Sequence, residues 1–169
     1  MRLFRNLVWI CAIGLAPELF AASKTTARLV LSAEQARPGD TILAGVELRM
    51  EPKWHTYWRN GGDAGITTKI DWVLPSGVSA GAIQWPVPEK WTAAGLTTYI
   101  YHGTAVLLIP LKFAESLRPG PVELKAKVSW LECEETCLPG AGEVAARITI
   151  GLESKSSPEA AMIQDAQKR

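Results

Sequence analysis

Cysteine and histidine are scarce in this sequence, which limits the metal sites that it could form. Its 169 residues include three cysteines and two histidines. Cys11 lies near the N-terminus, which leaves Cys133 and Cys137 as a pair and His55 and His102 as single imidazoles. A closed structural zinc site needs four ligands. Nothing in the sequence brings the histidines to the cysteine pair, so we treat each histidine as an ordinary packed or surface residue.

An excess of either charge is also absent. The chain has 18 Lys and Arg against 17 Asp and Glu, which gives a net charge of +1. Proteins that bind polyanions or acidic membrane surfaces usually carry a surplus of basic residues. We therefore expect no nucleic-acid partner.

The apolar run near the N-terminus is too short and too interrupted for a good transmembrane helix. Two arginines precede it, Pro17 breaks it, and small residues follow at 21–23. This pattern predicts a secretory signal peptide over 1–22, with an uncleaved anchor as the alternative. Cys11 is expected to leave with the signal. The rest of the chain should then work outside the cytoplasm, where disulfides form and persist.

A long helical period is missing before residue 155. Alternating apolar and polar segments occur instead, separated by Gly and Pro turn signals about every ten residues. This pattern predicts one domain over 24–152, an antiparallel β-sandwich of about seven to nine strands, with a closed barrel as the alternative. Residues 153–169 differ, because Ser-Ser-Pro followed by Glu-Ala-Ala predicts a helix with Pro158 in its first turn. This tail is either a surface helix or the start of a linker.

The two remaining cysteines lie four residues apart in the stretch WLECEETCLPG, residues 130–140. In one extended strand their Cα atoms would be roughly 13 Å apart, whereas a disulfide needs about 4.4–6.8 Å. The flanking residues are strand-like, and Pro139-Gly140 follows at once. We therefore predict a tight loop between two strands, with the cysteines facing each other at its neck, where another protein could reach them.

Three roles are open for this cysteine pair. A structural staple would close a ring of about five residues and contribute only about 2 kcal/mol. A metal clip would suit a soft ion such as Cu(I). A redox pair would exchange disulfides with a partner. Negative charge from Glu132, Glu134 and Glu135 disfavours thiolates and so favours the disulfide form, which predicts an electron donor.

Four stretches resemble the N-terminal periplasmic domain of the thiol:disulfide interchange protein DsbD and its ScsB-type relatives. They are WHTYWRNGGDAG at 54–65, IQWPVPEKW at 83–91, TYIYHGTAVLLIPL at 98–111 and VSWLECEETCLPG at 128–140. The C-x-x-x-C spacing is closer than in the DsbD pair and fits the ScsB-like branch better. The resemblance implies an immunoglobulin-like sandwich with one redox-active disulfide and no other cofactor.

The resemblance also implies a cap loop that shields the disulfide until a partner docks. The matching region is 86–95, and Trp91 is the expected cap aromatic. Tyr57 and Trp58 fall where members of the family place aromatics near the cysteines. The alternative for each of these three aromatics is an ordinary core position at a strand end.

The function implied by the resemblance is a periplasmic relay of electrons, as a component of a protein-disulfide reductase. In that family the domain takes electrons from a membrane-embedded partner domain. It passes them to periplasmic disulfide isomerases or to thioredoxin-like proteins, including those of cytochrome c biogenesis. Cys133 and Cys137 match the redox cysteines, and Cys137 is expected to engage partners. A copper-binding module that uses the same cysteines is the alternative, and an interaction domain with a local staple is a third reading.

Overall fold

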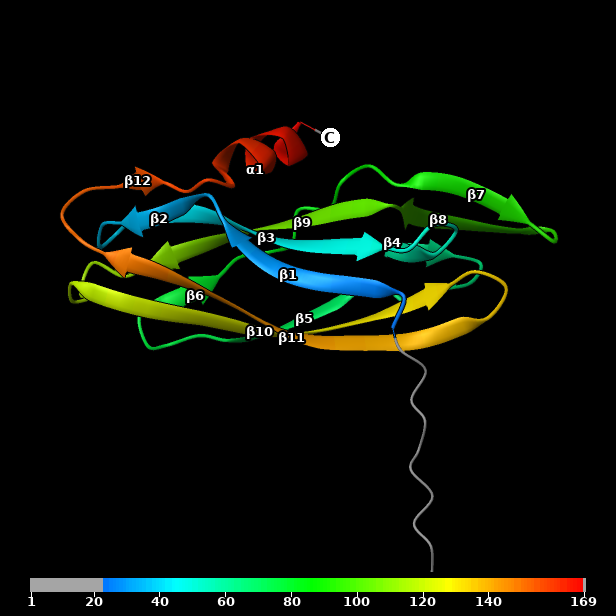
Figure 1. Cartoon of the computed structure of the whole chain (residues 1–169), viewed down its shortest axis with the longest axis horizontal. Coiled ribbons are helices and arrows are strands. Elements are labelled where there is room, and N and C mark those ends of the chain that lie inside the picture. Colours follow the sequence, from blue (N-terminus) through cyan, green and yellow to red (C-terminus); the bar gives the residue numbers. More distant parts are fainter. Residues whose placement is uncertain (1–22, 169) are drawn as a thin grey trace, which may run out of the picture.

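The computed structural model describes residues 23–168 (Figure 1). The expected signal peptide, with Cys11, lies outside these residues. Two β-sheets and one helix make up the described part of the chain. No helix among the described residues has both the length and the apolar character needed to cross a bilayer.

The smaller sheet has the strand order β1-β3-β9-β6. Its strands, all paired antiparallel, are Thr25–Leu31 (β1), Thr41–Met50 (β3), Val78–Ala80 (β6) and Thr104–Phe113 (β9). β1 and β9 flank the ten-residue strand β3, which places β3 near the middle of this layer.

The larger sheet has the order β12-β2-β11-β10-β4-β8-β7, and β5 also pairs with β10. Its strands are Ala33–Ala36 (β2), His55–Gly62 (β4), Lys69–Val73 (β5), Glu89–Ala93 (β7), Leu96–His102 (β8), Gly120–Cys133 (β10), Cys137–Ile150 (β11) and Lys155–Ser156 (β12). The β2–β11 pairing is parallel and the others are antiparallel. The twelve described strands exceed the expected seven to nine, because several are short edge pieces such as β6 and β12.

The hydrophobic core lies between the two sheets. Along β10, Leu124, Ala126 and Val128 are buried while the residues between them are exposed. This alternation is what a strand with one face on a core produces. The buried residues of β10 and β11 join those of β1, β3 and β9 in one cluster, which holds the two layers together as a sandwich.

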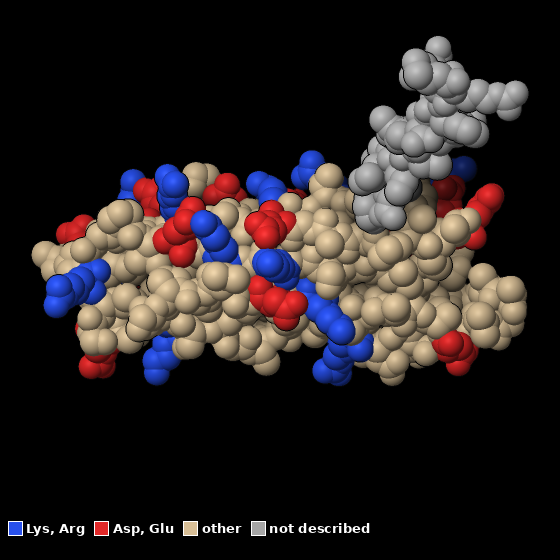
Figure 2. Space-filling view, turned by 90° about the horizontal axis from the view of Figure 1, so that it is seen from below, with Lys and Arg blue, Asp and Glu red and all other residues tan. Residues whose placement is uncertain are grey.

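The solvent-facing side of the β10–β11 layer carries both signs of charge. In Figure 2, basic and acidic side chains are interspersed on this face. Ion pairs such as Lys125 with Glu123 and Lys127 with Glu143 bring opposite charges together across and along the two strands. The charge balance of the sequence is thus repeated locally on this surface.

The C-terminal tail packs against the same domain. Strand β12 pairs with β2, and the helix α1, Ala160–Gln167, covers the outer side of β3 and β9 (Figure 1). Ile163 of α1 is buried beside Val30 and Leu108. The tail therefore forms the surface helix that was one of its two expected forms. Pro158 lies just before the helix instead of in its first turn, because α1 begins at Ala160.

The region expected to form a cap loop is a β-hairpin. Prolines at 86 and 88 cannot donate hydrogen bonds to a sheet, but β7 begins directly after them and places Trp91 opposite Thr98 of β8. Ala94 and Gly95 form the two-residue turn, both with positive φ. Turns with two positive φ values match the twist of antiparallel strands. The prolines thus set where the pairing starts and do not prevent it.

Candidate functional site

Cys133 and Cys137 form a disulfide at the end of the β10–β11 hairpin. They occupy the last paired position of the two strands, and their Cα atoms are 4.1 Å apart. Glu134, Glu135 and Thr136 form the turn beyond them, closed by a hydrogen bond from the Glu134 amide to the Thr136 carbonyl. The structure therefore has the tight neck that the spacing of the cysteines predicts.

The two cysteines differ in their access to solvent. Cys133 is only 2% exposed and packs against Tyr57, Ile100 and Leu131. Cys137 is exposed. Disulfide exchange requires an incoming thiolate to reach one sulfur in line with the bond. An approaching partner therefore meets Cys137, while the protein shields Cys133.

Strand β4 brings Tyr57 and His55 to the buried sulfur. His55 is the register partner of Cys133 across the β4–β10 pairing. The Tyr57 hydroxyl donates a hydrogen bond to Cys133 Sγ at 3.1 Å, and His55 Nε2 lies 3.2 Å from the same hydroxyl. Residues two apart on a strand share one face, so β4 presents both side chains together. The expectation that the histidines stay apart from the cysteines is therefore wrong for His55.

Burial affects the acidity of both side chains. Desolvation raises the pKa of the Tyr57 hydroxyl above its usual value. It also lowers the pKa of His55, and the neighbouring His102 lowers it further. His55 is therefore held in its neutral form to a lower pH than a free histidine.

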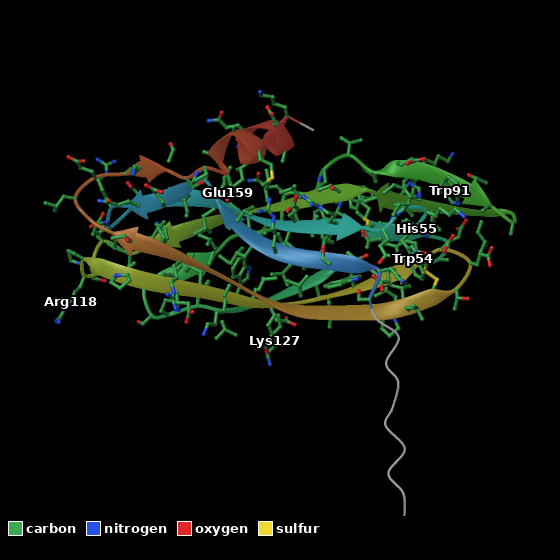
Figure 3. All side chains as sticks on the ribbon, viewed as in Figure 1. Trp54, His55, Trp91, Arg118, Lys127 and Glu159 are labelled. Carbon is green, nitrogen blue, oxygen red and sulfur yellow. A yellow bond between two sulfur atoms is a disulfide. The ribbon has the colours of Figure 1, made fainter. Side chains whose placement is uncertain are left out.

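The cap hairpin meets this cluster through His102. The His102 ring lies 5.7 Å from that of His55 and 5.6 Å from that of Trp91, both in edge-on geometry. His102 Nδ1 also lies 3.1 Å from a carboxylate oxygen of Glu89. Figure 3 shows Trp91 and His55 at the same end of the sandwich, from different strands. Trp91 therefore lies on the β7–β8 hairpin, in the region expected to form the cap, and it touches the site through His102.

Trp58 does not join the cluster around the disulfide. It follows Tyr57 on β4 and so points to the opposite face of the strand. There it packs with Trp54, Tyr101 and Met50, and the guanidinium of Arg59 lies 4.8 Å from its ring centre. Trp58 therefore takes the packed position at a strand that was given as the alternative, and the expectation that it lies near the cysteines is wrong.

The three acidic residues near the cysteines have different surroundings. Glu134 and Glu135 are exposed in the turn, and Glu134 lies 3.8 Å from Lys53. Glu132 is fully buried and accepts hydrogen bonds from Trp130 Nε1 at 3.0 Å and from the Lys24 amide at 2.7 Å. Glu132 therefore anchors the start of β1 to β10, and the two turn acids place carboxylates at the surface near the exposed sulfur, with Glu134 paired to Lys53.

Replacement of Glu132 by glutamine should destabilise the domain. Burial raises the pKa of this carboxyl, but the hydrogen bonds from Trp130 and Lys24 outweigh it and leave the pKa below its usual value. A lost charge-assisted hydrogen bond costs about 1.5–3 kcal/mol. The lowered pKa means that this contribution is complete above about pH 4.3 and disappears as the pH falls through the folded-state pKa. Urea unfolding at pH 7 and pH 3 measures it.

The matched control is Glu143→Gln, which removes an exposed carboxylate from β11. It should change the unfolding free energy by less than about 0.5 kcal/mol at either pH. A Glu132→Gln deficit that is as large at pH 3 as at pH 7 would contradict the role given to the ionised carboxylate.

The Gly-rich loop after β4 closes over the Tyr57 ring. A Cβ atom at Gly65 would lie 2.2 Å from Tyr57 Cδ1, and Gly65 has a φ of +105°. The Asp63 amide donates to the Thr97 carbonyl, and the Thr97 amide donates to the Asp63 carboxylate. These bonds tie the loop to the cap hairpin, so the loop holds Tyr57 against Cys133 and joins it to the cap.

Within residues 23–168 no group of three or more His, Cys, Asp and Glu side chains is arranged to hold a metal ion. Cys133 and His55 are bridged by the Tyr57 hydroxyl. The chemistry that this arrangement can perform directly is thiol–disulfide exchange at Cys137, with a hydroxyl and an imidazole beside the second sulfur.

The chain was compared with known proteins. The family model described as "Thiol:disulfide interchange protein DsbD, N-terminal" matches residues 27–148. No curated protein matches. The solved N-terminal periplasmic domain of ScsB from Proteus mirabilis is 21% identical, with a TM-score of 0.56, over 85% of this chain and 51% of that chain. The chain thus spans about half the length of that ScsB structure.

A second solved structure has a lower similarity. The DsbD N-terminal domain of Neisseria meningitidis in its reduced form is 14% identical, with a TM-score of 0.43, over 79% of this chain and 90% of that chain. At these identities the structural likeness concerns the fold, and the likeness to the ScsB domain agrees with the β-sandwich described above.

Proposed function

Because the chain belongs to the family of DsbD N-terminal domains, we propose that it is a periplasmic thiol–disulfide exchange domain that relays electrons through Cys133 and Cys137. Membership confirms the expected immunoglobulin-like β-sandwich. The observation that carries the proposed function is the asymmetry of the disulfide. One sulfur is open to a partner, and the other is buried and hydrogen-bonded to Tyr57.

This asymmetry assigns a step to each cysteine. In the reduced domain, the Cys137 thiolate attacks a partner disulfide and forms a mixed disulfide, releasing the partner's other thiolate. The buried Cys133 then attacks Cys137 Sγ, closes the Cys133–Cys137 bond and releases the second partner thiolate. Two electrons pass from the domain to the partner. Reduction of the domain by a donor follows the same steps in reverse.

The surroundings of the exposed sulfur favour the role of a donor. Glu134 and Glu135 carry negative charge in the turn next to Cys137. Negative charge disfavours thiolates and so lowers the oxidising power of the couple. The proposed partners are a membrane-embedded electron donor of the DsbD or ScsB type and periplasmic thioredoxin-like acceptors or disulfide isomerases. The exposed apolar side chains Val87, Trp91 and Leu96, in and before the β7–β8 hairpin, offer a contact surface for such partners.

The proposed function is tested by mixing the reduced protein with an oxidised disulfide isomerase, whose potential of about −180 mV makes it an acceptor, and quenching with an alkylating reagent. Mass spectrometry then counts the free thiols on each protein. We expect oxidation of Cys133 and Cys137 to match reduction of the isomerase, and a reduction potential well below the roughly −120 mV of a dedicated oxidant. Absence of exchange would overturn the proposed function, and a potential near −120 mV would overturn the direction of transfer.

Removal of the cap aromatic should open the disulfide to small reagents. Trp91 packs on His102 from β7, a strand whose residues are all exposed, and it is itself 44% exposed. Trp91→Ala should therefore raise the rate of reduction by dithiothreitol by roughly two- to fivefold, and its cost in unfolding free energy should stay within about 1 kcal/mol.

The control for the cap is Leu96→Ala, which truncates a side chain of similar exposure, 48%, at the hairpin turn. It should leave the rate of reduction unchanged. Equal rates for wild type and Trp91→Ala would show that Trp91 does not shield the disulfide.

A further inference from the structure

We propose that His55 accepts the proton of the buried Cys133 thiol through the Tyr57 hydroxyl, and that this relay enables Cys133 to resolve the mixed disulfide. The inference rests on the exchange function proposed above. It assigns a role to a histidine that neither the spacing of the cysteines nor the family match marks as functional. The proposal is based on a continuous chain of hydrogen bonds that runs from Cys133 Sγ through the Tyr57 hydroxyl to His55 Nε2.

The buried position of Cys133 creates the need for a relay. A thiol must lose its proton before it can attack. Cys133 is 2% exposed, so its proton has little direct access to water. Its apolar neighbours, Ile100 and Leu131, disfavour the thiolate and hold the proton on sulfur. The Tyr57 hydroxyl is the polar group in hydrogen-bond contact with this sulfur.

The direction of the hydrogen bonds differs between the two redox forms. In the disulfide form, Tyr57 donates its single proton to Cys133 Sγ, so His55 must donate from Nε2 to the Tyr57 oxygen. In the dithiol form, the Cys133 thiol can donate to the Tyr57 oxygen, and Tyr57 can donate to a neutral His55 Nε2. The same three groups therefore serve both forms without a change of partner.

The resolving step moves one proton and exchanges one disulfide bond for another. The Cys133 proton passes to the Tyr57 oxygen as the Tyr57 proton passes to His55 Nε2, so no free tyrosinate forms. The Cys133 thiolate attacks Cys137 Sγ, the Cys133–Cys137 bond forms, and the bond from Cys137 to the partner sulfur breaks. The partner sulfur leaves with the electron pair as a thiolate. His55 is left as an imidazolium, which returns its proton to water or to the leaving thiolate.

The charged and titratable groups around His55 allow it to act as this base. Tyr57 lies on its own strand, Cys133 faces it from β10, and His102 faces it from β8. On β7, Glu89 bonds to His102. Burial and His102 lower the pKa of His55, so its neutral, proton-accepting form is present from below pH 6.5 upward.

The resolving step can be isolated with 5,5′-dithiobis(2-nitrobenzoate). Cys137 of the reduced protein reacts with this reagent first and releases one thionitrobenzoate, at a rate that depends on reagent concentration. Cys133 then displaces the second thionitrobenzoate, at a rate independent of that concentration. Stopped-flow absorbance from pH 5 to pH 9 follows both phases in the wild type, His55→Gln, Tyr57→Phe and the double variant.

We expect the second phase of the wild type to be level above about pH 6.5 and to fall at lower pH. In His55→Gln it should be at least tenfold slower at pH 7 and should rise with pH towards the thiol range near 8.5. The first phase should be unchanged. Tyr57→Phe should behave as His55→Gln does, and the double variant should be no slower than either, because both act on one path.

Tyr99→Phe is the matched control, since it removes a hydroxyl from the neighbouring strand, where Tyr99 packs on Trp58. It should keep the wild-type profile. A His55→Gln variant that folds normally by circular dichroism and keeps the wild-type pH profile would overturn the relay while leaving the exchange function in place. A wild-type protein that releases only one thionitrobenzoate would instead overturn the proposed function itself.

Discussion

Replacement of Cys137 by serine is expected to slow electron exchange with a thioredoxin-like protein by a factor on the order of a thousand or more, because the thiolate is the attacking species. Cys133 cannot replace it as the attacking residue, because the Cys133 side chain is only 2% exposed and lies opposite Cys137 at the last paired position of the hairpin. The measurement is the rate at which an oxidised disulfide isomerase, with a potential of about −180 mV, is reduced by the pre-reduced variant.

The matched variant is Cys133→Ser, which also removes the disulfide but leaves the exposed sulfur in place. With a thioredoxin-like protein that keeps only its attacking cysteine, activated with thionitrobenzoate, it should form a mixed disulfide at close to the wild-type rate and then stop, because neither protein keeps a second cysteine to resolve the bond. Loss of the first step in both variants to the same extent would contradict the separate roles assigned to the two sulfurs.

Replacement of Gly65 by alanine is expected to destabilise the domain strongly. The residue has a φ of +105°, and its new Cβ would lie 2.2 Å from the Tyr57 ring. A left-handed conformation costs a non-glycine residue roughly 1–2 kcal/mol, and overpacking costs about 1–3 kcal/mol more. Urea unfolding should show a combined loss of about 2–5 kcal/mol.

A second consequence of Gly65→Ala separates this clash from general destabilisation. Displacement of Tyr57 should break its hydrogen bond to Cys133 and slow the resolving step of the variant even where it is fully folded. Gly95→Ala is the control, because Gly95 also has a positive φ, of +81°, but has nothing within 4 Å of the added Cβ. Gly95→Ala should lose only the roughly 1–2 kcal/mol of unfolding free energy that the left-handed conformation costs. Its resolving step should proceed at the wild-type rate. Equal behaviour of the two variants would contradict the contact with Tyr57.

The sequence predicted the sandwich and the hairpin neck because both depend on local patterns. Alternation along 120–133 places every second residue of β10 in the core, as in Leu124 and Val128. The four-residue spacing of the cysteines excluded a single strand and left a turn. Such inferences need only the geometry of one or two neighbouring strands.

The surroundings of the disulfide could not be predicted in the same way. His55 meets Cys133 because β4 pairs with β10, strands far apart in the chain, and no local signal states this pairing. The period of two between His55 and Tyr57 does show that the two side chains share a face, and it could have linked them once Tyr57 was suspected. The same period would have separated Trp58 from the site. Glu132 was grouped with Glu134 and Glu135 as a negative charge near the cysteines. Its hydrogen-bond donors, Trp130 and Lys24, are brought to it only by the fold.

The most direct test of the central claim is the identity of the sulfur that holds a trapped partner. Cys133→Ser, reduced and mixed with a thioredoxin that keeps only its attacking cysteine, activated as a mixed disulfide with thionitrobenzoate, should release thionitrobenzoate and give one complex with the summed mass of the two proteins. Peptide mapping should place the link at Cys137. The account predicts this complex in high yield and its absence from Cys137→Ser. A complex that forms through Cys133 in Cys137→Ser with equal yield, or no complex with either variant, would contradict an exchange domain that works through an exposed Cys137 and a buried Cys133.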